Sequence, residues 1–352
     1  MGQAIERRDA GSGKGTRGGD PAARLVRYAD LVPCRNAFVD TRTPGSDAKE
    51  NFTIVGPGVS ENPNQHVHIP EPHGFNIGGA RQPPGCLNSQ HSHLTAEVFV
   101  VHSGRWRFVY GVEADEGEVR LGPGDTISIP PRMFRGFENI GDETSFLFAV
   151  LGGDDPGKVT WAPRVFELAR DYGLVLLEGG RLVDTTVGET VPEGAVRERA
   201  PTAAELDELA TPDAARLARC VARAESLRAD AASPLAADGV EDAPVIVETV
   251  SGDAESAAEG STAADGAIRG WWTHGFELRR VTLAPGARVA EHVGESPEVV
   301  FVHAGRLDVT LPGGTLAMAS GDTASLPARE AREWRNPADE PATVYRVYGV
   351  RR

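Results

Sequence analysis

The chain has 352 residues, 40% of them hydrophobic, so it is long enough for two domains with complete cores. Its net charge of -15 argues against nucleic acid as a partner, because phosphate contacts need a basic face. The 3 cysteines show no C-x2-C spacing and indicate neither a disulfide framework nor a structural zinc site. No apolar run is long enough to span a membrane, and the first residues lack the apolar core of a signal peptide, so we expect a cytoplasmic protein.

Residues 1–24 are polar, glycine-rich and charged, and we predict a disordered tail there. From Leu25 onward, short apolar runs alternate with turn residues, which favours many short strands. We predict an N-terminal domain over residues 25–185. Within it, 146–151 is an apolar strand, and 164–172 has the spacing of a short helix that ends at Gly173.

Two histidines and a carboxylate lie in the middle of this domain. On a strand, side chains alternate between faces, so His91 and His93 point the same way and Glu97 can return to that face. Two imidazoles and one carboxylate suit iron, manganese, copper or zinc. We therefore predict that His91, His93 and Glu97 bind one divalent metal ion.

Aromatic residues follow on the next strand, where Trp106, Phe108 and Tyr110 share one face. Farther on, Phe137 shares a face with Arg135. Two interpretations stay open for the aromatic residues: they are core residues, or they line a cavity that takes a flat apolar substrate. Gln82 and Asn88 are candidates for hydrogen bonds at the mouth of the site, but no spacing argument supports either.

Residues 186–243 are predicted to be a helical and acidic linker. Thr211 and Pro212 make an N-cap and first-turn pair, which opens a predicted helix through Leu217 to about Arg228. From 229 to 268 there is no Lys or Arg, and within this stretch 245–247 is the predicted strand.

Residues 244–352 repeat the first domain, at an offset of 201 residues in the first half of the module and 197 in the second half. The repeated pairs include His73 and His274, Gly85 and Gly286, His91 and His292, Glu97 and Glu298, Arg135 and Arg332, and Asn139 and Asn336. Gly294 stands where the second histidine is expected. One imidazole and one carboxylate are too few to hold a divalent ion firmly, so we predict a metal-free second site in which Arg332 pairs with Glu298.

This pattern resembles the cupin family, whose first motif is Gly-x5-His-x-His-x3-Glu-x6-Gly. The chain meets every position of it, with Gly85, His91, His93, Glu97 and Gly104. The second motif, Gly-x5-Pro-x-Gly-x2-His-x3-Asn, is met at Gly124, Pro130 and Asn139. Arg132 replaces its glycine, and Arg135 replaces the histidine that is the usual fourth ligand. The resemblance implies an all-β bicupin of two tandem jelly-roll barrels with a few short helices, packed on each other through sheet edges.

The resemblance also implies a mononuclear metal enzyme. Our first expectation is an Fe(II) dioxygenase acting on a small anionic substrate, aromatic compounds included, with Mn, Cu, Zn or Ni as other ions. Arg135 is then the catalytic residue that binds the anionic group. The residues expected to bind the substrate body are Trp106, Phe108, Tyr110 and Phe137. The alternatives are a non-oxidative isomerase, cyclase or decarboxylase, and a metal-free binding protein in which Arg135 takes the place of the ion.

The sequence gives weaker indications that other histidines take part in the metal site. His73 recurs as His274, so it is either structural or a hydrogen-bond partner that orients a ligand imidazole. His102 has the opposite parity to Glu97 and is predicted to face away from the barrel interior. The partner we expect is a small anionic molecule, with no nucleic acid and no membrane, and self-association is left open.

Overall fold

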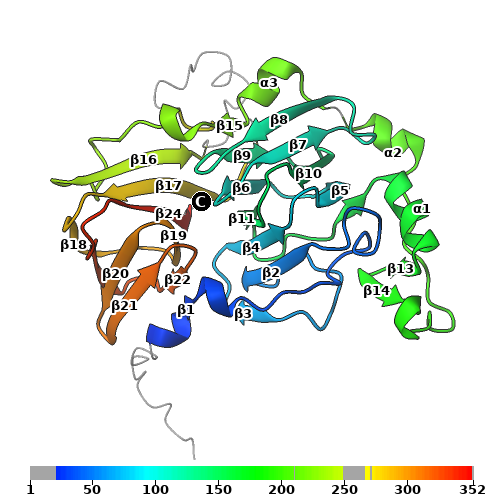
Figure 1. Ribbon diagram of the computed structural model, residues 1–352, viewed down its shortest axis with the longest axis horizontal. Coiled ribbons are helices and arrows are strands. Elements are labelled where there is room, and N and C mark those ends of the chain that lie inside the picture. Colours follow the sequence, from blue (N-terminus) through cyan, green and yellow to red (C-terminus); the bar gives the residue numbers. More distant parts are fainter. Residues whose placement is uncertain (1–20, 210, 249–265, 270–271, 351–352) are drawn as a thin grey trace, which may run out of the picture.

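The computed structural model describes residues 21–209, 211–248, 266–269 and 272–350 (Figure 1). The predicted tail, apart from 21–24, and most of the acidic stretch after 248 lie outside these residues. Two sandwich-like barrels lie side by side, and α1, β13 and β14 flank the outer side of the first (Figure 1). No helix in the described ranges is both long and apolar enough to cross a membrane.

The first module consists of a seven-stranded and a five-stranded sheet. The seven-stranded sheet has the order β15-β9-β6-β11-β4-β2-β3, and the five-stranded sheet has the order β12-β5-β10-β7-β8. The strands of the larger sheet are β2 (Glu50–Val55), β3 (Val67–Ile69), β4 (Phe75–Gln82), β6 (Glu97–Val101), β9 (Thr126–Ile129), β11 (Ser145–Gly152) and β15 (Val221–Ala222). Those of the smaller sheet are β5 (Leu87–Ser92), β7 (Trp106–Tyr110), β8 (Gly117–Leu121), β10 (Arg135–Asn139) and β12 (Thr160–Trp161).

The second module repeats this plan with a six-stranded sheet, β1-β22-β19-β24-β17-β16, and a four-stranded sheet, β18-β23-β20-β21. The strands of the six-stranded sheet are β1 (Leu25–Val26), β16 (Val240–Ile246), β17 (Phe276–Leu283), β19 (Glu298–Ala304), β22 (Thr323–Leu326) and β24 (Ala342–Gly349). The strands of the four-stranded sheet are β18 (Arg288–Val293), β20 (Arg306–Leu311), β21 (Gly314–Ala319) and β23 (Ala331–Arg335). The prediction of two tandem jelly-roll barrels is confirmed.

The remaining elements are short. They are the hairpin β13 (Leu174–Leu177) and β14 (Arg181–Asp184), the helices α1 (Pro163–Asp171), α2 (Ala203–Asp207) and α3 (Ala214–Ala218), and the 3-10 turns η1 (Pro21–Arg24), η2 (Tyr28–Asp30), η3 (Thr185–Val187) and η4 (Ala224–Ser226). The predicted helix before Gly173 is confirmed as α1, and Gly173 has the left-handed φ of 78° that favours glycine.

The long helix predicted from Thr211 to about Arg228 is wrong. Asp213, not Thr211, caps α3, which is only 5 residues long. The chain then becomes extended because β15 pairs with β9, with Val221 opposite Ile127. Pairing with the edge of a sheet therefore overrides the local helical pattern.

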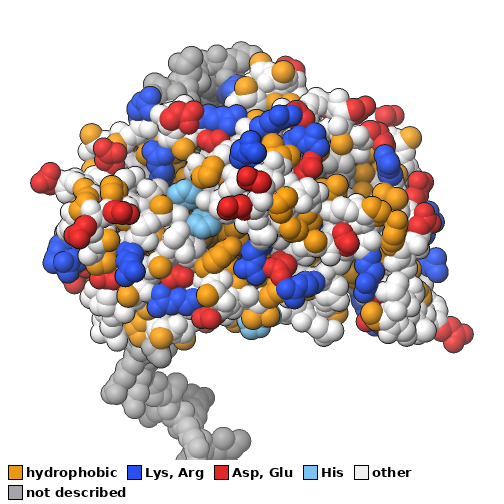
Figure 2. Space-filling view, in the orientation of Figure 1, with side chains coloured by type: hydrophobic (Ala, Val, Ile, Leu, Met, Phe, Trp, Pro, Cys, Tyr) orange, Lys and Arg blue, Asp and Glu red, His pale blue; other side chains and the backbone are white. Residues whose placement is uncertain are grey.

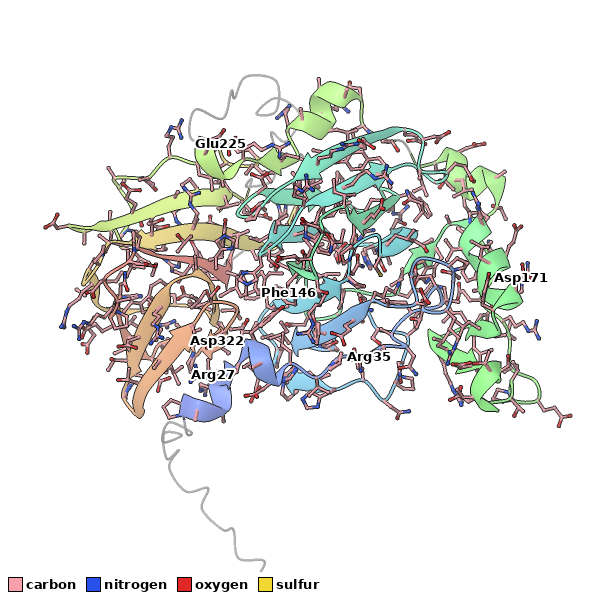
Figure 3. All side chains as sticks on the ribbon, viewed as in Figure 1. Arg27, Arg35, Phe146, Asp171, Glu225 and Asp322 are labelled. Carbon is pink, nitrogen blue, oxygen red and sulfur yellow. The ribbon has the colours of Figure 1, made fainter. Side chains whose placement is uncertain are left out.

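Each module receives a short strand from the segment that precedes the other module in the chain. β1 precedes the first module but pairs with β22 of the second, and β15 precedes the second but pairs with β9 of the first. An ion pair secures each exchange, Arg27 with Asp322 at 2.7 Å (Figure 3) and Arg223 with Asp125 at 2.7 Å. Because of this exchange, Leu25 and Val26 lie in the second module's sheet, although they begin the predicted first domain.

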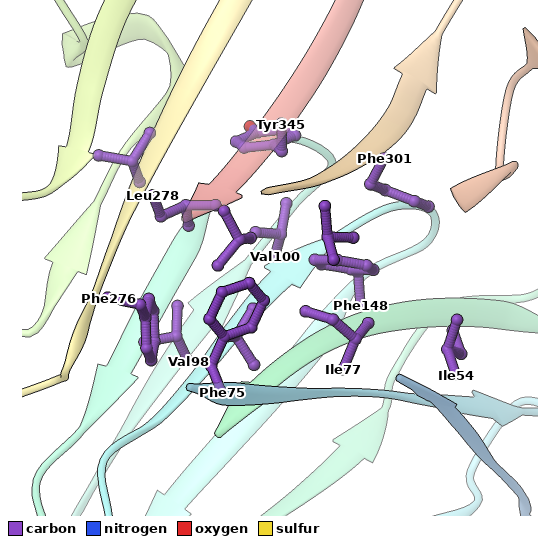
Figure 4. Packing of buried hydrophobic residues seen from close by; sticks show 14 of the residues in the cluster. Ile54, Phe75, Ile77, Val98, Val100, Phe148, Phe276, Leu278, Phe301 and Tyr345 are labelled. Atoms are coloured by element: carbon purple, nitrogen blue, oxygen red, sulfur yellow. The ribbon is translucent and has the colours of Figure 1, made fainter. Parts of the chain in front are cut away.

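The two modules pack through sheet faces, so the prediction of packing through sheet edges is wrong. The outer faces of the two large sheets form one apolar cluster, which includes Val98, Val100, Phe148, Leu278 and Phe301 (Figure 4). The rings of Phe148 and Phe301 stack with centroids 4.4 Å apart. This shared core fixes one barrel against the other.

Histidines lie in the same interface in a reciprocal arrangement. His73 Nε2 lies 2.6 Å from Ser325 Oγ, and His274 Nε2 lies 2.8 Å from Ser128 Oγ. His102 faces away from the barrel interior, as predicted from its parity, and its ring lies 5.5 Å from that of His303. On the molecular face seen in Figure 2, acidic and basic side chains are interspersed, with no continuous basic field.

Candidate metal centre

The structure brings the predicted ligand triad together inside the first barrel. His91 lies on β5, His93 is the first residue after the end of β5, and Glu97 is the first residue of β6. All three are buried, and their candidate ligand atoms lie within 4.8 Å of one another. The alternation of side chains on a strand thus predicted the convergence correctly.

Both imidazoles are suited to bind a cation. His91 Nδ1 lies 2.7 Å from the carbonyl oxygen of Ser89 and donates its proton there, which leaves the lone pair on Nε2. His93 Nδ1 is buried without a hydrogen-bond partner among the described residues. Burial lowers the pKa of both imidazoles well below 6.5, and the charge of Arg135 adds to this effect. Both rings are therefore neutral at neutral pH, as a metal ligand requires.

Arg135 lies behind the triad on β10. It is 1% exposed, and it donates from Nη2 to Glu97 Oε2 and from Nη1 to the carbonyl oxygen of His91 at 3.0 Å. Burial raises the pKa of Glu97, while Arg135 opposes that rise. Glu97 Oε1 is the oxygen nearer to His93, 3.7 Å from its Nε2. Arg135 binds only Oε2 of Glu97. Oε1 is therefore left to bind an ion together with the two imidazoles.

A small cavity of about 70 Å³ lies against the triad. His91, His93 and Glu97 line it together with apolar side chains, among them Phe99 and Phe137. In this measure one water occupies about 10–15 Å³, whereas drug-sized ligands need about 300–1,000 Å³. The cavity therefore has room for a substrate of only a few non-hydrogen atoms. A larger hollow of about 520 Å³ lies beside α1 and contains no member of the triad.

Only one of the residues predicted to bind the substrate lines the cavity. Phe137 lines the cavity as predicted. Trp106, Phe108 and Tyr110 are at most 1% exposed, belong to the core of the first barrel and do not line the cavity, which supports the core interpretation for these three. Arg135 does not line the cavity either, so its placement gives no support to the prediction that it binds the substrate.

The prediction that His73 hydrogen-bonds to a ligand imidazole is wrong. One ring nitrogen lies 2.7 Å from the carbonyl oxygen of Glu71 and the other contacts Ser325 in the second module. Both nitrogens thus have partners at the module interface. The structural role suggested by the recurrence of His73 as His274 is the correct one.

In the second module Arg332 pairs with Glu298, as predicted. Arg332 donates to Glu298 Oε2 at 3.0 Å, and Arg346 donates to Glu298 Oε1 at 2.7 Å. A Cβ atom at Gly294 would lie 2.8 Å from Arg332 Nη2, so the guanidinium fills the space that a second histidine would need. With both carboxylate oxygens bound by arginines, no oxygen is left for an ion.

Sequence reasoning named Asn88 as a candidate but missed the buried ion pair that holds it. Lys49 and Asp40 are both fully buried, and their ion pair holds the side chain of Asn88, which borders the cavity. Neither Lys49 nor Asp40 lies in a motif, and Asn88 is separated from His91 by an odd number of residues. The sequence signal was absent because a bulge in β5 changes the alternation of side chains.

Comparisons with known proteins agree with this fold. Residues 80–151 and 279–348 each match the cupin domain family. The chain is therefore a bicupin, with two cupin domains in one polypeptide. No curated protein sequence gave a significant match.

Solved structures of oxalate decarboxylase from Bacillus subtilis are similar over almost the whole chain. The structure at pH 4.6 has a TM-score of 0.55 at 13% identity, covering 96% of this chain and 77% of that one. A deletion variant has a TM-score of 0.56 at 13% identity, covering 96% and 78%. A structure described for its Mn(II) centres has a TM-score of 0.55 at 13% identity, covering 96% and 78%. At this identity, the likeness concerns the fold.

Proposed function

We propose that the first module is a mononuclear divalent-metal enzyme for non-oxidative chemistry, with decarboxylation of a small dicarboxylate as the leading reaction. The observation that carries this proposal is the buried triad of His91, His93 and Glu97 beside a cavity of about 70 Å³. The fold likeness to an oxalate decarboxylase with Mn(II) centres supports manganese as the ion and a carboxylate as the substrate.

The size of the cavity favours a reaction of a small substrate over a reaction of an aromatic acid with dioxygen. An aromatic acid placed together with dioxygen needs far more room than about 70 Å³, whereas a dicarboxylate of two or three carbons needs little. The Fe(II) dioxygenase that the sequence suggested first therefore becomes the second choice, and Fe(II) remains a candidate for the ion.

The charges of the site favour a dianion. Glu97 and Arg135 cancel each other, and both imidazoles are neutral, so a divalent ion would leave a net charge of about +2 in a buried site. Uncompensated charge is costly away from water. A substrate with two carboxylates would neutralise the site, while a neutral substrate would not.

The residues of the chain have distinct tasks in this proposal. When bound, the ion supplies Lewis-acid polarisation of a coordinated carboxylate. Ser89 keeps His91 in the tautomer that has its lone pair on Nε2, and Arg135 holds Glu97 in place. Phe99 and Phe137 exclude water from the apolar side of the cavity. In decarboxylation a C–C bond breaks, carbon dioxide leaves and the product carbon takes up a proton, so no oxidant is consumed.

A metal-free binding protein is the third candidate, and the Arg135–Glu97 ion pair favours it. In that case the guanidinium occupies the role of the ion, as Arg332 does in the second module. The two candidates predict opposite results for metal binding by His91 and His93.

The test is anaerobic turnover of oxalate and malonate by the Mn(II)-loaded and the Fe(II)-loaded protein, measured as release of carbon dioxide. The proposal expects turnover without oxygen, its loss in the His91→Ala, His93→Ala double variant, and little change in the matched His292→Ala variant. Turnover that requires oxygen would favour the dioxygenase. Turnover that survives in the double variant would contradict the proposal.

A further inference from the structure

We infer that Asn88 presents its amide N–H donors to the metal cavity, with its orientation fixed by the buried Lys49–Asp40 pair, and thereby receives one carboxylate of the substrate. This inference rests on the proposed function and names the group that recognises the anion.

The pairing of β5 with β10 puts Asn88 on the inner face of the barrel. His91 lies opposite Arg135 and Asn88 lies opposite Phe137, so β5 spans three residues where β10 spans two. This bulge turns Asn88 to the same face as His91, although their separation in the sequence predicts opposite faces. Asn88 is 6% exposed, and it borders the cavity together with the triad. Asn88 and Phe137 both line the larger hollow beside α1 as well.

Lys49 determines which way the amide of Asn88 points. Lys49 Nζ donates to Asn88 Oδ1 at 2.6 Å and also to Asp40 Oδ1. Because an ammonium group can only donate, the amide oxygen must face Lys49, and the NH₂ group must point away from it. Nδ2 of Asn88 donates to no acceptor within the described residues. The amide therefore has free donors beside the cavity, which Asn51, whose Nδ2 is buried without a partner among the described residues, also lines.

The same ion pair also supports the first metal ligand. Asp40 Oδ2 accepts from the backbone N–H of Ser89 at 3.0 Å, and the carbonyl oxygen of Ser89 accepts from His91 Nδ1. A fully buried Lys–Asp pair is weak evidence for stability, because its desolvation cost offsets much of its attraction. Its contacts instead orient two neighbouring groups of the site, the Asn88 amide and the His91 ring.

The second module serves as an internal comparison. There Val289 lies opposite Trp334 and His292 lies opposite Arg332, with the same bulge between the two pairs. The position of Asn88 is thus occupied by Val289, which is 3% exposed and lies in the apolar core. The module that lacks the second histidine also lacks the amide donor, so the two features occur together in the first module.

Asn88 fills a role that Arg135 leaves open. Arg135 contacts Glu97 and the His91 backbone and does not line the cavity. If one carboxylate of a dicarboxylate binds the ion, the other carboxylate needs hydrogen-bond donors, since an unpaired buried oxygen is costly. The NH₂ group of Asn88 supplies such donors without adding charge. The ligand class is a small dicarboxylate.

The test is oxalate affinity of the Mn(II)-loaded full chain, followed by the change in its EPR spectrum, together with manganese content. Asn88→Asp keeps the shape and the acceptor for Lys49 but replaces the donors with a negative charge. Asn88→Val copies the second module. Asn64→Asp, at an exposed amide in the loop before β3, is the matched control.

We expect both Asn88 variants to retain one manganese and to lose at least about tenfold in oxalate affinity, as for the loss of a hydrogen bond to a charged group, while the control matches the parent. Lys49→Met, which frees the amide to rotate, should also weaken oxalate binding, compared at equal bound manganese. Oxalate affinity within about threefold of the parent in both manganese-loaded Asn88 variants would overturn the inference alone. A parent that binds no manganese would overturn the proposed function, and this inference with it.

Discussion

Replacing Arg135 with methionine should make the stability of the protein depend on metal. Arg135 is 1% exposed, and its removal leaves the carboxylate of Glu97, itself 6% exposed, without its ionic partner. Breaking a buried ion pair from one side costs about 3–5 kcal/mol. The metal-free Arg135→Met variant should therefore be less stable than the parent by that amount.

A divalent ion should restore this loss because it places positive charge beside Glu97 again. An ion at 100 times its Kd adds about 2.7 kcal/mol to the free energy of unfolding. The matched control is Arg332→Met, in which Glu298 keeps its bond to Arg346 at 2.7 Å. We expect a smaller loss there, about 1–2 kcal/mol, and no rescue by metal.

The assay is urea denaturation followed by circular dichroism, with chelator and with saturating Mn(II). The reasoning is refuted if metal-free Arg135→Met is as stable as the parent. It is also refuted if Mn(II) stabilises Arg135→Met no more than it stabilises Arg332→Met.

Two further predictions concern the module interface and the second site. Burial lowers the pKa of His102 and of His303 from 6.5 to about 4 in the folded protein. As the pH drops from about 6.5 to about 4, these histidines bind protons in the unfolded chain but not in the folded one, so the free energy of unfolding should fall. Urea midpoints at several pH values check this, and a shallower fall is expected in a His102→Phe variant; an unchanged slope would contradict it. Gly294→His should destabilise the chain by steric conflict with Arg332, and adding Arg332→Ala should relieve it; equal thermal stability of the parent and the single variant would refute the conflict.

Much of the architecture could be predicted because the repeat and the strand periodicity are local in the sequence. The recurrence of His91 as His292 and of Glu97 as Glu298 predicted two modules of one plan, and the structure has them. Alternation along the strand predicted the convergence of His91, His93 and Glu97. The Arg332–Glu298 pair of the second module was predicted from Gly294 and Arg332 together.

The incorrect predictions concern features that depend on contacts between residues far apart in the sequence. The residues after α3 pair with a sheet edge of the first module, so the predicted helix stops early. Nothing in the local pattern of Phe148 distinguishes a core inside one barrel from a core between two. The bulge in β5 reverses the parity of Asn88, which the sequence does not show. Parity placed Trp106 on the inner face correctly but could not tell core from cavity.

The most direct test of the central claim is metal content by mass spectrometry after loading with Mn(II) or Fe(II) under anaerobic conditions. The comparison is between the parent, the His91→Ala, His93→Ala double variant and the matched His292→Ala variant. We expect about one ion per chain in the parent and in His292→Ala, and none in the double variant. A parent that retains no ion, or a double variant that retains as much as the parent, would contradict a metal centre in the first module.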